Sequence, residues 1–326
     1  MARDRIQRDH RGGLLRAALP GLALLLLASL PPVRADTREM RIAVVTSRAI
    51  GPYEEAVDGF RAQIHASLPN AAITVYDLNG NVALGPAMAA EITSKSFSLV
   101  QLVGTEAYKA ISPYLHGVPM IISMVYDPET EFGLDPARDP QTYGVRLRVP
   151  IARQLEVVKS FCPLVRRVSY IYSGGSALPR SEVDDAADQG IRLEGIPIAD
   201  LGQLEKALDQ ARTRSDAFLM VLDPNIYTRT TTENVLLYFM RAKVPVFSFS
   251  PNYVKAGALL SVSASYQDNG ATAARLAVDL LTGNPVREHF VPTREIRMDW
   301  NTRAAEALGL ELSAANRARC TELFGS

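Results

Sequence analysis

The sequence predicts an α/β protein made of two doubly wound parallel-sheet lobes joined by a hinge of several crossovers. From Arg41 onward, short apolar runs alternate with amphipathic segments of helical length, which is typical of parallel strands covered on both faces. The alternation stops in a stretch rich in Pro and Asp at 127–140 and then restarts, which indicates two similar series. A chain of 326 residues is long enough for two such lobes.

Each series is built from alternating strands and helices. In the first helix, Ala56, Val57, Phe60 and Ile64 recur at helical spacing and form one apolar face. The strands expected in the first series are 42–46, 72–78, 97–103 and 120–125, with helices at 53–67, 83–95 and 105–112. Those expected in the second series are 168–173, 191–198, 217–222 and 244–249, with helices at 180–189, 201–213 and 229–242.

The segments outside the two series predict how the lobes are connected. Residues 143–147 lie between the series and are expected to cross from one lobe to the other. A helix at 268–282 and a tail at 294–326 follow the second series, which indicates that the chain returns to the first lobe and crosses again. The predicted first lobe is 41–146 plus about 264–287, and the second is 147–263 plus about 288–326.

Residues 1–35 have the organisation of a cleavable secretory signal peptide. Five arginines in 1–16 precede an apolar run at 17–30, and Val33 and Ala35 occupy the minus-three and minus-one positions. A retained signal-anchor helix is the alternative, although the run is shorter than the roughly 20 residues of a span. Cleavage after Ala35 would remove six arginines and two aspartates from 35 basic and 35 acidic residues, leaving 29 and 33. We therefore expect a soluble protein in an extracytoplasmic space.

Composition excludes several function classes. Balanced charge removes the electrostatic footprint of a nucleic-acid binder, and two cysteines cannot build a zinc ribbon or a disulfide scaffold. Cys162 and Cys320 either pair in an oxidising compartment or stay as free thiols. The four histidines are scattered, and no nucleophile elbow or His-Glu-x-x-His motif is present. We expect no catalysis, no metal and no cofactor, in a monomer.

Candidate ligand-binding residues follow the predicted strands, because ligands of parallel sheets bind outside the carboxyl ends of the strands. These ends carry small, polar or aromatic residues in both series. The predicted ligand-binding set is Ser47, Arg48, Asn79, Gly104, Thr105, Glu106, Ser123, Tyr126, Ser173, Gly174, Asp223, Asn225, Phe249 and Ser250.

Most of these positions have a structural alternative. Gly104 and Thr105 precede a helix, where they would hold an anionic group or simply cap the helix. Asp223 would pair with a ligand ammonium or hydroxyl, or cap the turn that leads into the helix at 229–242. Tyr126 and Phe249 would form flat apolar walls of a site or belong to the core.

Four segments carry a resemblance to a known family. They are Val118-Pro119 leading to Asp127-Pro128; Pro245-Val246-Phe247 followed by Val254-Lys255 and Gly257-Ala258-Leu259; Tyr266, Asp268 and Gly270 before Leu281-x-Gly283-x-Pro285; and Asn301-Thr302 with Ala304, Ala307 and Leu308-Gly309-Leu310. In order and spacing they resemble the bacterial ABC-transporter substrate-binding proteins of the type I periplasmic-binding fold, whose known ligands include aromatic amino acids. The resemblance covers about residues 41–312.

The resemblance implies a periplasmic receptor that closes two lobes over a small molecule and presents it to an ABC permease in the inner membrane. A periplasmic ligand-sensing subunit that signals to a membrane kinase or cyclase is the alternative, and an exported enzyme ranks after it. In the family pattern Asp223 matches an acidic residue and Thr105 lies in a loop that holds a carboxylate. Ser250 and Pro224 stand where relatives usually have Asp and Asn, so a less polar solute joins amino acids and carboxylates as a candidate ligand.

Overall fold

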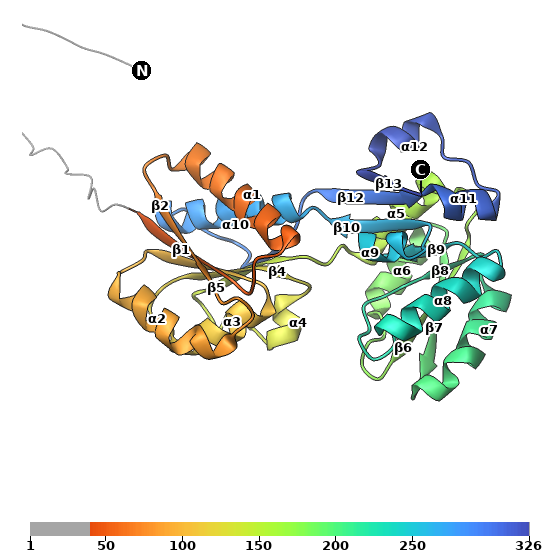
Figure 1. Ribbon diagram of the computed structural model, residues 1–326, viewed down its shortest axis with the longest axis horizontal. Helices are drawn as coiled ribbons and strands as arrows, with labels where there is room; N and C mark the ends of the chain where they lie inside the picture. The colour runs from red at the N-terminus through yellow and green to blue at the C-terminus, as the bar shows by residue number, and fades with distance from the viewer. Residues whose placement is uncertain (1–39, 326) are drawn as a thin grey trace, which may run out of the picture. The chain divides into compact units, whose positions relative to one another are not determined.

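The computed structural model describes residues 40–325, and two mostly parallel sheets organise this part of the chain (Figure 1). The first sheet has six strands in the order β11-β5-β4-β3-β1-β2, and every neighbouring pair is parallel. Its strands are β1 (Arg41–Thr46), β2 (Ala72–Asp77), β3 (Leu99–Val103), β4 (Met120–Val125), β5 (Thr142–Arg146) and β11 (Phe290–Pro292).

Helices cover both faces of the first sheet, as the continuous apolar strands predict. Helices α1 (Gly51–Ser67) and α10 (Tyr266–Thr282) pack on one face, around Phe60 and Ala273. Helices α2 (Gly85–Ser94) and α3 (Thr105–Ile111) cover the opposite face, around Ile92 and Leu102. Figure 1 shows the two pairs above and below the strands. The 3₁₀ turns η1 (Val82–Leu84) and η2 (Ser112–Tyr114) and helix α4 (Pro128–Phe132) complete this lobe.

The second sheet has seven strands in the order β13-β12-β10-β9-β8-β6-β7, and the β10–β12 pair is its antiparallel member. Its strands are β6 (Arg167–Ser173), β7 (Arg192–Ile198), β8 (Ala217–Leu219), β9 (Val246–Ser248), β10 (Leu260–Ala264), β12 (Ile296–Asn301) and β13 (Glu322–Phe324). Its covering elements are α5 (Ile151–Phe161), α6 (Arg180–Asp188), η3 (Leu201–Gln203), α7 (Leu204–Arg214), α8 (Arg229–Arg241), α9 (Pro251–Lys255), α11 (Thr302–Leu308) and α12 (Ala314–Arg319).

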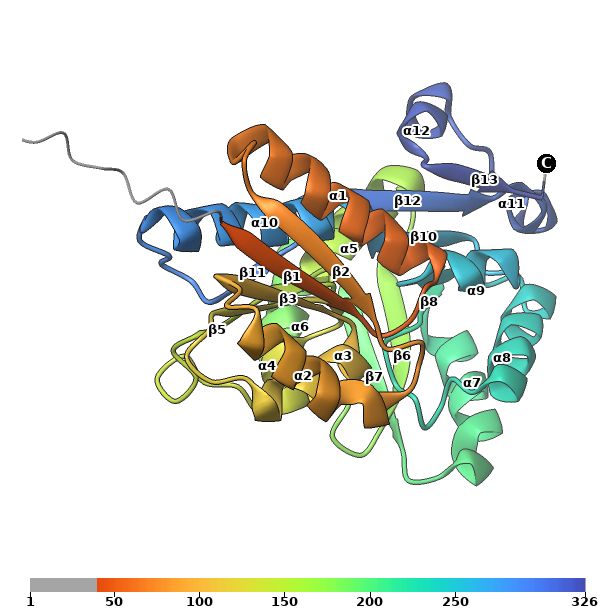
Figure 2. The ribbon, with the colours of Figure 1, turned by 60° about the vertical axis from the view of Figure 1, so that its left-hand side comes forward.

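Two apolar clusters again lie on opposite faces of this sheet. Residues of α5 and α11 pack around Trp300 on one face, while α7, α8 and α9 pack around Phe218 and Phe239 on the other. The C-terminal elements α11, α12 and β13 lie around β12 (Figure 2). The predicted fold class is therefore confirmed, with two doubly wound lobes in the described part of the chain.

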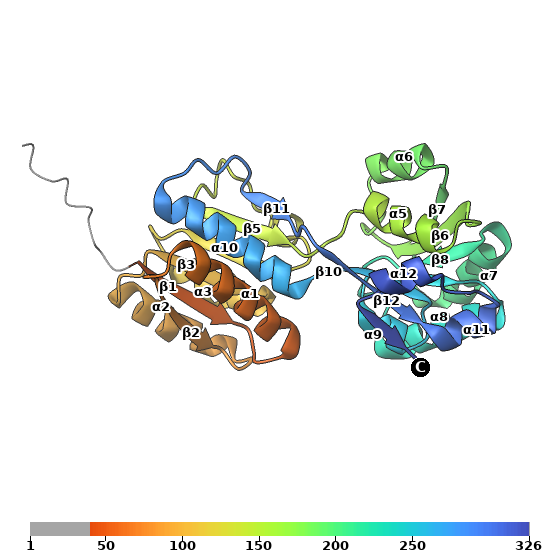
Figure 3. The ribbon, with the colours of Figure 1, turned by 90° about the horizontal axis from the view of Figure 1, so that it is seen from above.

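Three connections join the two lobes, and they can be followed in Figure 3. The chain passes from β5 to α5, from β10 to α10 and from β11 to β12. Strand β11 pairs with β5 in the first sheet, so residues 290–292 lie on the first-lobe side of the boundary expected at about 288. This strand has three residues and adds only a sheet edge, which leaves too weak a pattern to recognise.

The elements expected from periodicity are present, with ends shifted by a few residues. The 127–140 stretch contains α4, which Asp127 caps through a hydrogen bond from the Thr130 N–H. The expected crossover at 143–147 is mostly strand β5. Elements α5, α9, β10 and those of the tail were not among the expected strands and helices. The predicted signal peptide lies outside the described residues, and no helix from 40 to 325 meets the length and hydropathy of a bilayer span.

Helices α1 and α10 come from opposite ends of the chain and cross at two glycines. A Cβ on Gly270 would lie 1.8 Å from the Ala56 carbonyl oxygen, and one on Gly59 would lie 2.0 Å from the Gln267 carbonyl oxygen. Because these neighbours are helix backbone, they cannot move aside without separating the helices. The absence of a side chain at both positions allows the C-terminal half of the chain to complete the first lobe.

The substitution Gly270→Ala should therefore destabilise the protein by about 2–3 kcal/mol or more, because it forces the two helices apart. The measurement is the free energy of unfolding in denaturant. Gly51→Ala serves as the control, since no atom lies within 4 Å of a Cβ at Gly51. Its effect should stay within about 0.5 kcal/mol. Equal losses in the two variants would contradict the close-crossing explanation.

Both cysteines are free thiols, and both contribute to the Trp300 cluster of the second lobe. Helix α12 is attached to α5 by a hydrogen bond from Asn316 Nδ2 to the Ser160 carbonyl oxygen, at 2.8 Å. Burial raises the pKa of Cys162 to about 12. Burial, with a smaller contribution from the Asp299 charge, raises the pKa of Cys320 to about 11. At neutral pH both groups are therefore protonated and weakly nucleophilic.

Alkylation followed by mass spectrometry tests this state of the thiols. Native protein at pH 8 should react slowly with iodoacetamide, because little thiolate is present at a pH far below both pKa values. Protein unfolded without reductant should take up two labels. Labelling that requires prior reduction would show that Cys162 and Cys320 form a disulfide.

Candidate functional site

The predicted ligand-binding residues lie in loops at the carboxyl ends of the strands of both sheets. We call the loops of the first lobe the first rim, which comprises 46–48, 79–81, 104–106 and 123–127. The loops of the second lobe form the second rim, which comprises 173–176, 223–227 and 248–253. In sheets of this type, such rims are where ligands bind.

Inside the first rim, polar side chains hold the loops to one another. The Ser47 hydroxyl is buried, donates to the Val103 carbonyl oxygen at 3.0 Å and accepts from the Ala107 N–H at 2.9 Å. Ser123, also buried, accepts a hydrogen bond from Gln101 Nε2, and its carbonyl oxygen accepts from the Gly104 N–H. Ser47, Gly104 and Ser123 are thus brought together as supports of the rim.

Gly104 is required by this arrangement. Its φ of +91° lies in a region that disfavours L side chains, and a Cβ there would lie 2.6 Å from both the Ser47 Oγ and the Tyr53 hydroxyl oxygen. Burial raises the pKa of Tyr53, with a further rise from the Glu106 charge. Tyr53 is a polar neighbour of this rim that sequence reasoning missed, because it lies inside an ordinary helical pattern.

Charged groups of the first rim are paired locally. Arg48 Nη2 lies 2.6 Å from Glu106 Oε1, in a half-exposed ion pair. The Thr105 hydroxyl donates to Glu131 Oε1 at 2.9 Å. A ligand carboxylate at the start of α3 would therefore meet two glutamates already present. Asn79 has a φ of +49°, and its N–H donates to Asp77. Within the described part of the chain it forms no hydrogen bond with the other predicted residues.

The second rim is organised by a buried carboxylate. Asp223 has no exposed surface and accepts hydrogen bonds from the Ser173 N–H at 2.7 Å, the Ser173 hydroxyl at 3.0 Å and the Asn225 N–H at 3.0 Å. Asn225 Nδ2 donates in turn to Ser173 Oγ at 3.1 Å. Asp223 therefore joins the ends of β6 and β8, as its alternative interpretation as a turn residue predicts. Among residues 40–325 no basic side chain forms an ion pair with it.

Two further predicted residues of this rim stand apart from that group. Gly174 is exposed with a φ of +49°, as a tight loop requires. The Ser250 hydroxyl accepts from the Asn252 N–H at 3.4 Å and caps α9. Ser250 therefore has a structural role at the start of α9.

Aromatic side chains connect the two rims. The Tyr126 ring meets the Phe249 ring edge to face with centroids 6.1 Å apart, and Phe249 meets Tyr253 in the same way at 5.3 Å. Tyr253 and Tyr227 are 6.5 Å apart, and the buried Tyr227 hydroxyl has no hydrogen-bond partner within the described chain. Burial raises the pKa of Tyr126 and Tyr227. We call Tyr126, Phe249, Tyr253 and Tyr227 the aromatic wall.

Arg148 and Glu182 are neighbours of the aromatic wall that sequence reasoning missed. They form an ion pair with side chains 24% and 11% exposed, and Glu182 Oε2 also accepts from the Ile151 N–H at 3.2 Å. The Arg148 charge partly offsets the effect of burial on the pKa of Tyr126, so the two groups are close. The sequence feature that could have indicated this contact is the position of Arg148 directly after the expected crossover at 143–147.

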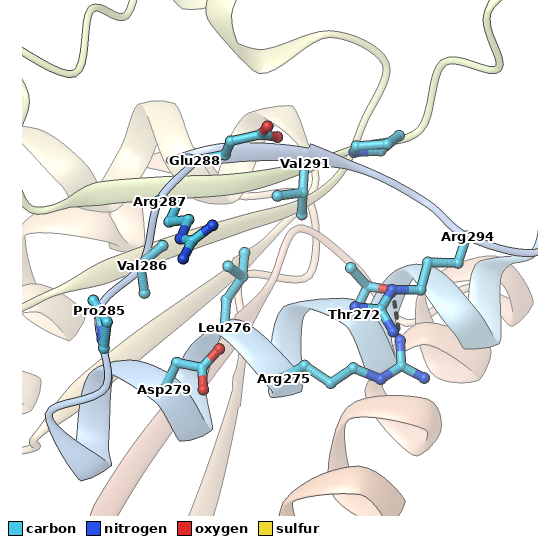
Figure 4. Close-up of a pocket in the computed structure, with 11 residues that line it drawn as sticks. Thr272, Arg275, Leu276, Asp279, Pro285, Val286, Arg287, Glu288, Val291 and Arg294 are labelled. Atoms are coloured by element: carbon cyan, nitrogen blue, oxygen red, sulfur yellow. Dashed lines mark hydrogen bonds between the residues drawn. The ribbon is translucent and has the colours of Figure 1, made fainter.

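Two hollows help to define where small molecules fit. One of about 210 Å³ adjoins the first rim and is lined by Thr46, Arg48, Tyr53 and Asp77 among others. Another of about 390 Å³ lies between α10 and residues 285–294, and it contains none of the predicted ligand-binding residues (Figure 4). Within residues 40–325 no group of three or more His, Cys, Asp or Glu side chains is placed to hold a metal ion.

The structure thus has two doubly wound lobes whose rims meet at Tyr126 and Phe249. The comparison with known families agrees, since residues 70–322 match the family described as ABC transporter substrate binding protein. The chain belongs to this family of substrate-binding proteins.

Individual relatives are more distant. A curated "Tyrosine-binding protein" of Clostridioides difficile (strain R20291) is 23% identical over 245 residues, covering 70% of this chain and 68% of the relative. The fold is also similar to a ligand-free, open substrate-binding protein with adhesive properties from Clostridium difficile, with a TM-score of 0.71, 18% identity and coverage of 88% and 100%. A Streptococcus pneumonia ABC domain in complex with L-Trp has a TM-score of 0.57, 18% identity and coverage of 87% and 100%.

The hydrogen bonds of Asp223 predict a structural cost when it is removed. Asp223→Ala should destabilise the ligand-free protein by about 1–3 kcal/mol, because the buried Ser173 N–H loses its acceptor. The measurement is again the free energy of unfolding. Asp200→Ala is the matched control, since Asp200 accepts the Gly202 N–H at 2.8 Å in an exposed loop of the same lobe. An equal loss in both variants would show that burial of the Asp223 carboxylate contributes nothing.

Proposed function

We propose that this substrate-binding protein captures a solute with a planar apolar group against Tyr126 and Phe249 as the lobes close. The observation that supports this proposal most directly is the contact between these two rings, because one ring comes from each rim. A flat ligand group stacked or edge-on against such rings gains apolar burial and a favourable quadrupole interaction. The names of the relatives, one tyrosine-binding and one in complex with L-Trp, support a ring-bearing ligand.

The polar groups around the aromatic wall favour a ligand of low net charge. Arg48 and Arg148 are already paired with Glu106 and Glu182, and the Asp223 carboxylate accepts three hydrogen bonds from the chain. A charged ligand group would have to replace one of these internal partners, at a cost in free energy. The Thr105 N–H at the start of α3 and the side-chain amide of Asn225 would then supply the remaining hydrogen bonds.

Delivery to an ABC permease completes the proposed function. Solute binding would favour a closed arrangement of the rims, and the permease would recognise that arrangement. A signal peptide at 1–35, as the sequence predicts, would direct the mature protein to the periplasm, and this expectation supports a receptor role. The first direct test is calorimetry of the mature chain against tyrosine, tryptophan, 3-phenylpropionate and phenethylamine, with alanine and ribose as solutes that lack a ring.

Ring-bearing solutes should bind and the other two should not. Comparison of tyrosine with 3-phenylpropionate and phenethylamine shows which head group the rims accept. Binding of ribose or alanine as tightly as any ring-bearing solute would contradict the role of the aromatic wall. Failure of every solute to bind would remove the proposed ligand class.

Phe249→Ala should weaken binding of the preferred solute about 10- to 100-fold, because loss of one aromatic wall corresponds to roughly 1.5–3 kcal/mol. The measurement is the dissociation constant by calorimetry. Phe324→Ala is the control, since Phe324 is a partly buried Phe of the same lobe that lies outside both rims and stacks under Lys255. Equal affinities of the Phe249 variant and the unaltered protein would place the ligand elsewhere.

A further inference from the structure

Two consecutive side chains at the start of α10 contact the connections between the lobes. Asp268 is 5% exposed and Asn269 is fully buried, although both are polar. Buried polar groups of this kind need hydrogen-bond partners, so the identity of the partners indicates what the groups do. With Thr293 from the third connection, they form what we call the hinge clamp.

Asn269 and Thr293 join the first and third connections. Asn269 Oδ1 accepts the Met124 N–H at 2.9 Å, and Asn269 Nδ2 donates to Thr293 Oγ1 at 2.8 Å. The Thr293 hydroxyl donates onward to the Arg146 carbonyl oxygen at 2.8 Å, at the end of β5. These hydrogen bonds attach α10 to β4 at Met124 and to the third connection at Thr293. Through Thr293 they also reach Arg146, where the first connection begins.

Asp268 joins the second and third connections. Its Oδ2 accepts the Arg294 N–H at 2.8 Å and the Glu295 N–H at 2.9 Å, and the Ser265 N–H donates to the Glu295 carbonyl oxygen at 2.9 Å. Arg275 Nη1 lies 3.3 Å from Asp268 Oδ1 and donates to Thr272 Oγ1 at 2.9 Å. Arg275 and Thr272 also line the hollow of Figure 4, on the solvent side of the clamp.

The backbone at Met124 supports a fixed geometry here. Met124 is buried with a φ of +58°, a conformation that costs free energy for a residue with a side chain. The register of β4 against β5 shifts between Ile122 and Val125. The hydrogen bond from the Met124 N–H to Asn269 therefore holds the strained end of β4, and the next two residues accept the Leu147 and Arg148 N–H groups of the first connection.

Beyond the clamp, each connection enters the second lobe almost at once. The Arg148 N–H still pairs with the Tyr126 carbonyl oxygen, whereas the Val149 carbonyl oxygen accepts from Gln154 Nε2 of α5. In the other two connections, Ala264 and Ile296 face each other as the last pair of the β10–β12 ladder. The first connection thus reaches contacts of the second lobe at Val149, and the other two reach the second sheet at Ala264 and Ile296.

We propose that Asp268, Asn269 and Thr293 are positioning residues that fix the first-lobe ends of all three connections as one rigid unit. The lobes then turn about three neighbouring peptide bonds, namely 148–149, 264–265 and 295–296. The Arg148–Glu182 ion pair spans the first of these pivots and limits the range of rotation. This inference rests on the proposed function, since it concerns the closure by which the solute is bound.

The clamp should control affinity from outside the ligand site. If its hydrogen bonds are lost, the connections bend independently and the ligand-free protein samples more relative positions of the lobes. The binding-competent fraction of the population then falls, and the apparent dissociation constant rises in proportion. Movement of the three connections as one unit thus contributes to the affinity for the solute.

The test uses Thr293→Val and Asn269→Asp, which remove a hydroxyl and an amide donor from the clamp at nearly constant volume. Matched controls are Thr302→Val and Asn301→Asp. Thr302 Oγ1 donates to the Phe324 carbonyl oxygen at 2.9 Å, and Asn301 Nδ2 donates to the Val254 carbonyl oxygen at 2.7 Å, both within the second lobe. The controls lose the same kinds of bond without touching a connection.

The first readout is the distribution of distances between spin labels at A90C and E233C, both exposed, in a chain that also carries C162A and C320S. Without ligand, the clamp variants should give a broader distribution than the controls. The second readout is the dissociation constant of the solute found by calorimetry, which should rise about 5- to 30-fold in the clamp variants alone.

Unchanged distance distributions in both clamp variants would overturn the proposal, as would equal broadening in the controls. Thr293→Val keeps the test valid if Asn269→Asp does not fold beside Asp268. The distance measurement needs no ligand, so it decides the role of the clamp even if no solute binds. Failure of the proposed function and failure of this inference are therefore distinguishable.

Discussion

The packing of α10 on the first sheet is the constraint on which the rest of the structure depends. This helix follows the complete α/β series of the second lobe, yet its apolar face belongs to the core around Phe60. The first lobe is therefore incomplete until the chain has made β6 to β10 of the second, and the chain then crosses a third time to add β12 and β13. Gly59 and Gly270 allow α1 and α10 to cross at close range, because carbonyl oxygens of the facing helix occupy the space that a Cβ would fill at each position.

Periodicity predicts two kinds of element well: long helices with one apolar face and strands made of a continuous buried run. Helix α1 repeats an apolar face over 17 residues, and β4 is a run of six buried residues, so each is visible in the sequence alone. Strand β11 has three residues, and α4 and α9 have five each, too few to repeat a period. Their existence depends on tertiary partners, such as β5 for β11, which a local pattern does not contain.

The candidate site shows the same division between local and long-range information. Strand ends are local features, so the loops of both rims could be predicted, including Asp223 directly after a buried stretch. The partners of each side chain are not local, because Ser173 and Asp223 are 50 residues apart and Arg148 meets a glutamate of α6. Sequence could therefore indicate which loops lie at the carboxyl ends of the strands but not which of their polar groups already have hydrogen-bond partners. Whether the polar groups of the rims are already paired decides how much net charge a bound solute can carry.

The three connections between the lobes relate the fold to the candidate site. A protein that binds by closure needs its rims to meet in one defined arrangement, so rotation has to be confined to few bonds. Parallel sheets supply rigid lobes, and the return of α10 to the first lobe places Asp268 and Asn269 beside every connection at once. Polar side chains suit this place better than apolar ones, because hydrogen bonds to backbone groups specify direction as well as proximity. The helix that completes the first core is thus also the element that determines where the molecule bends.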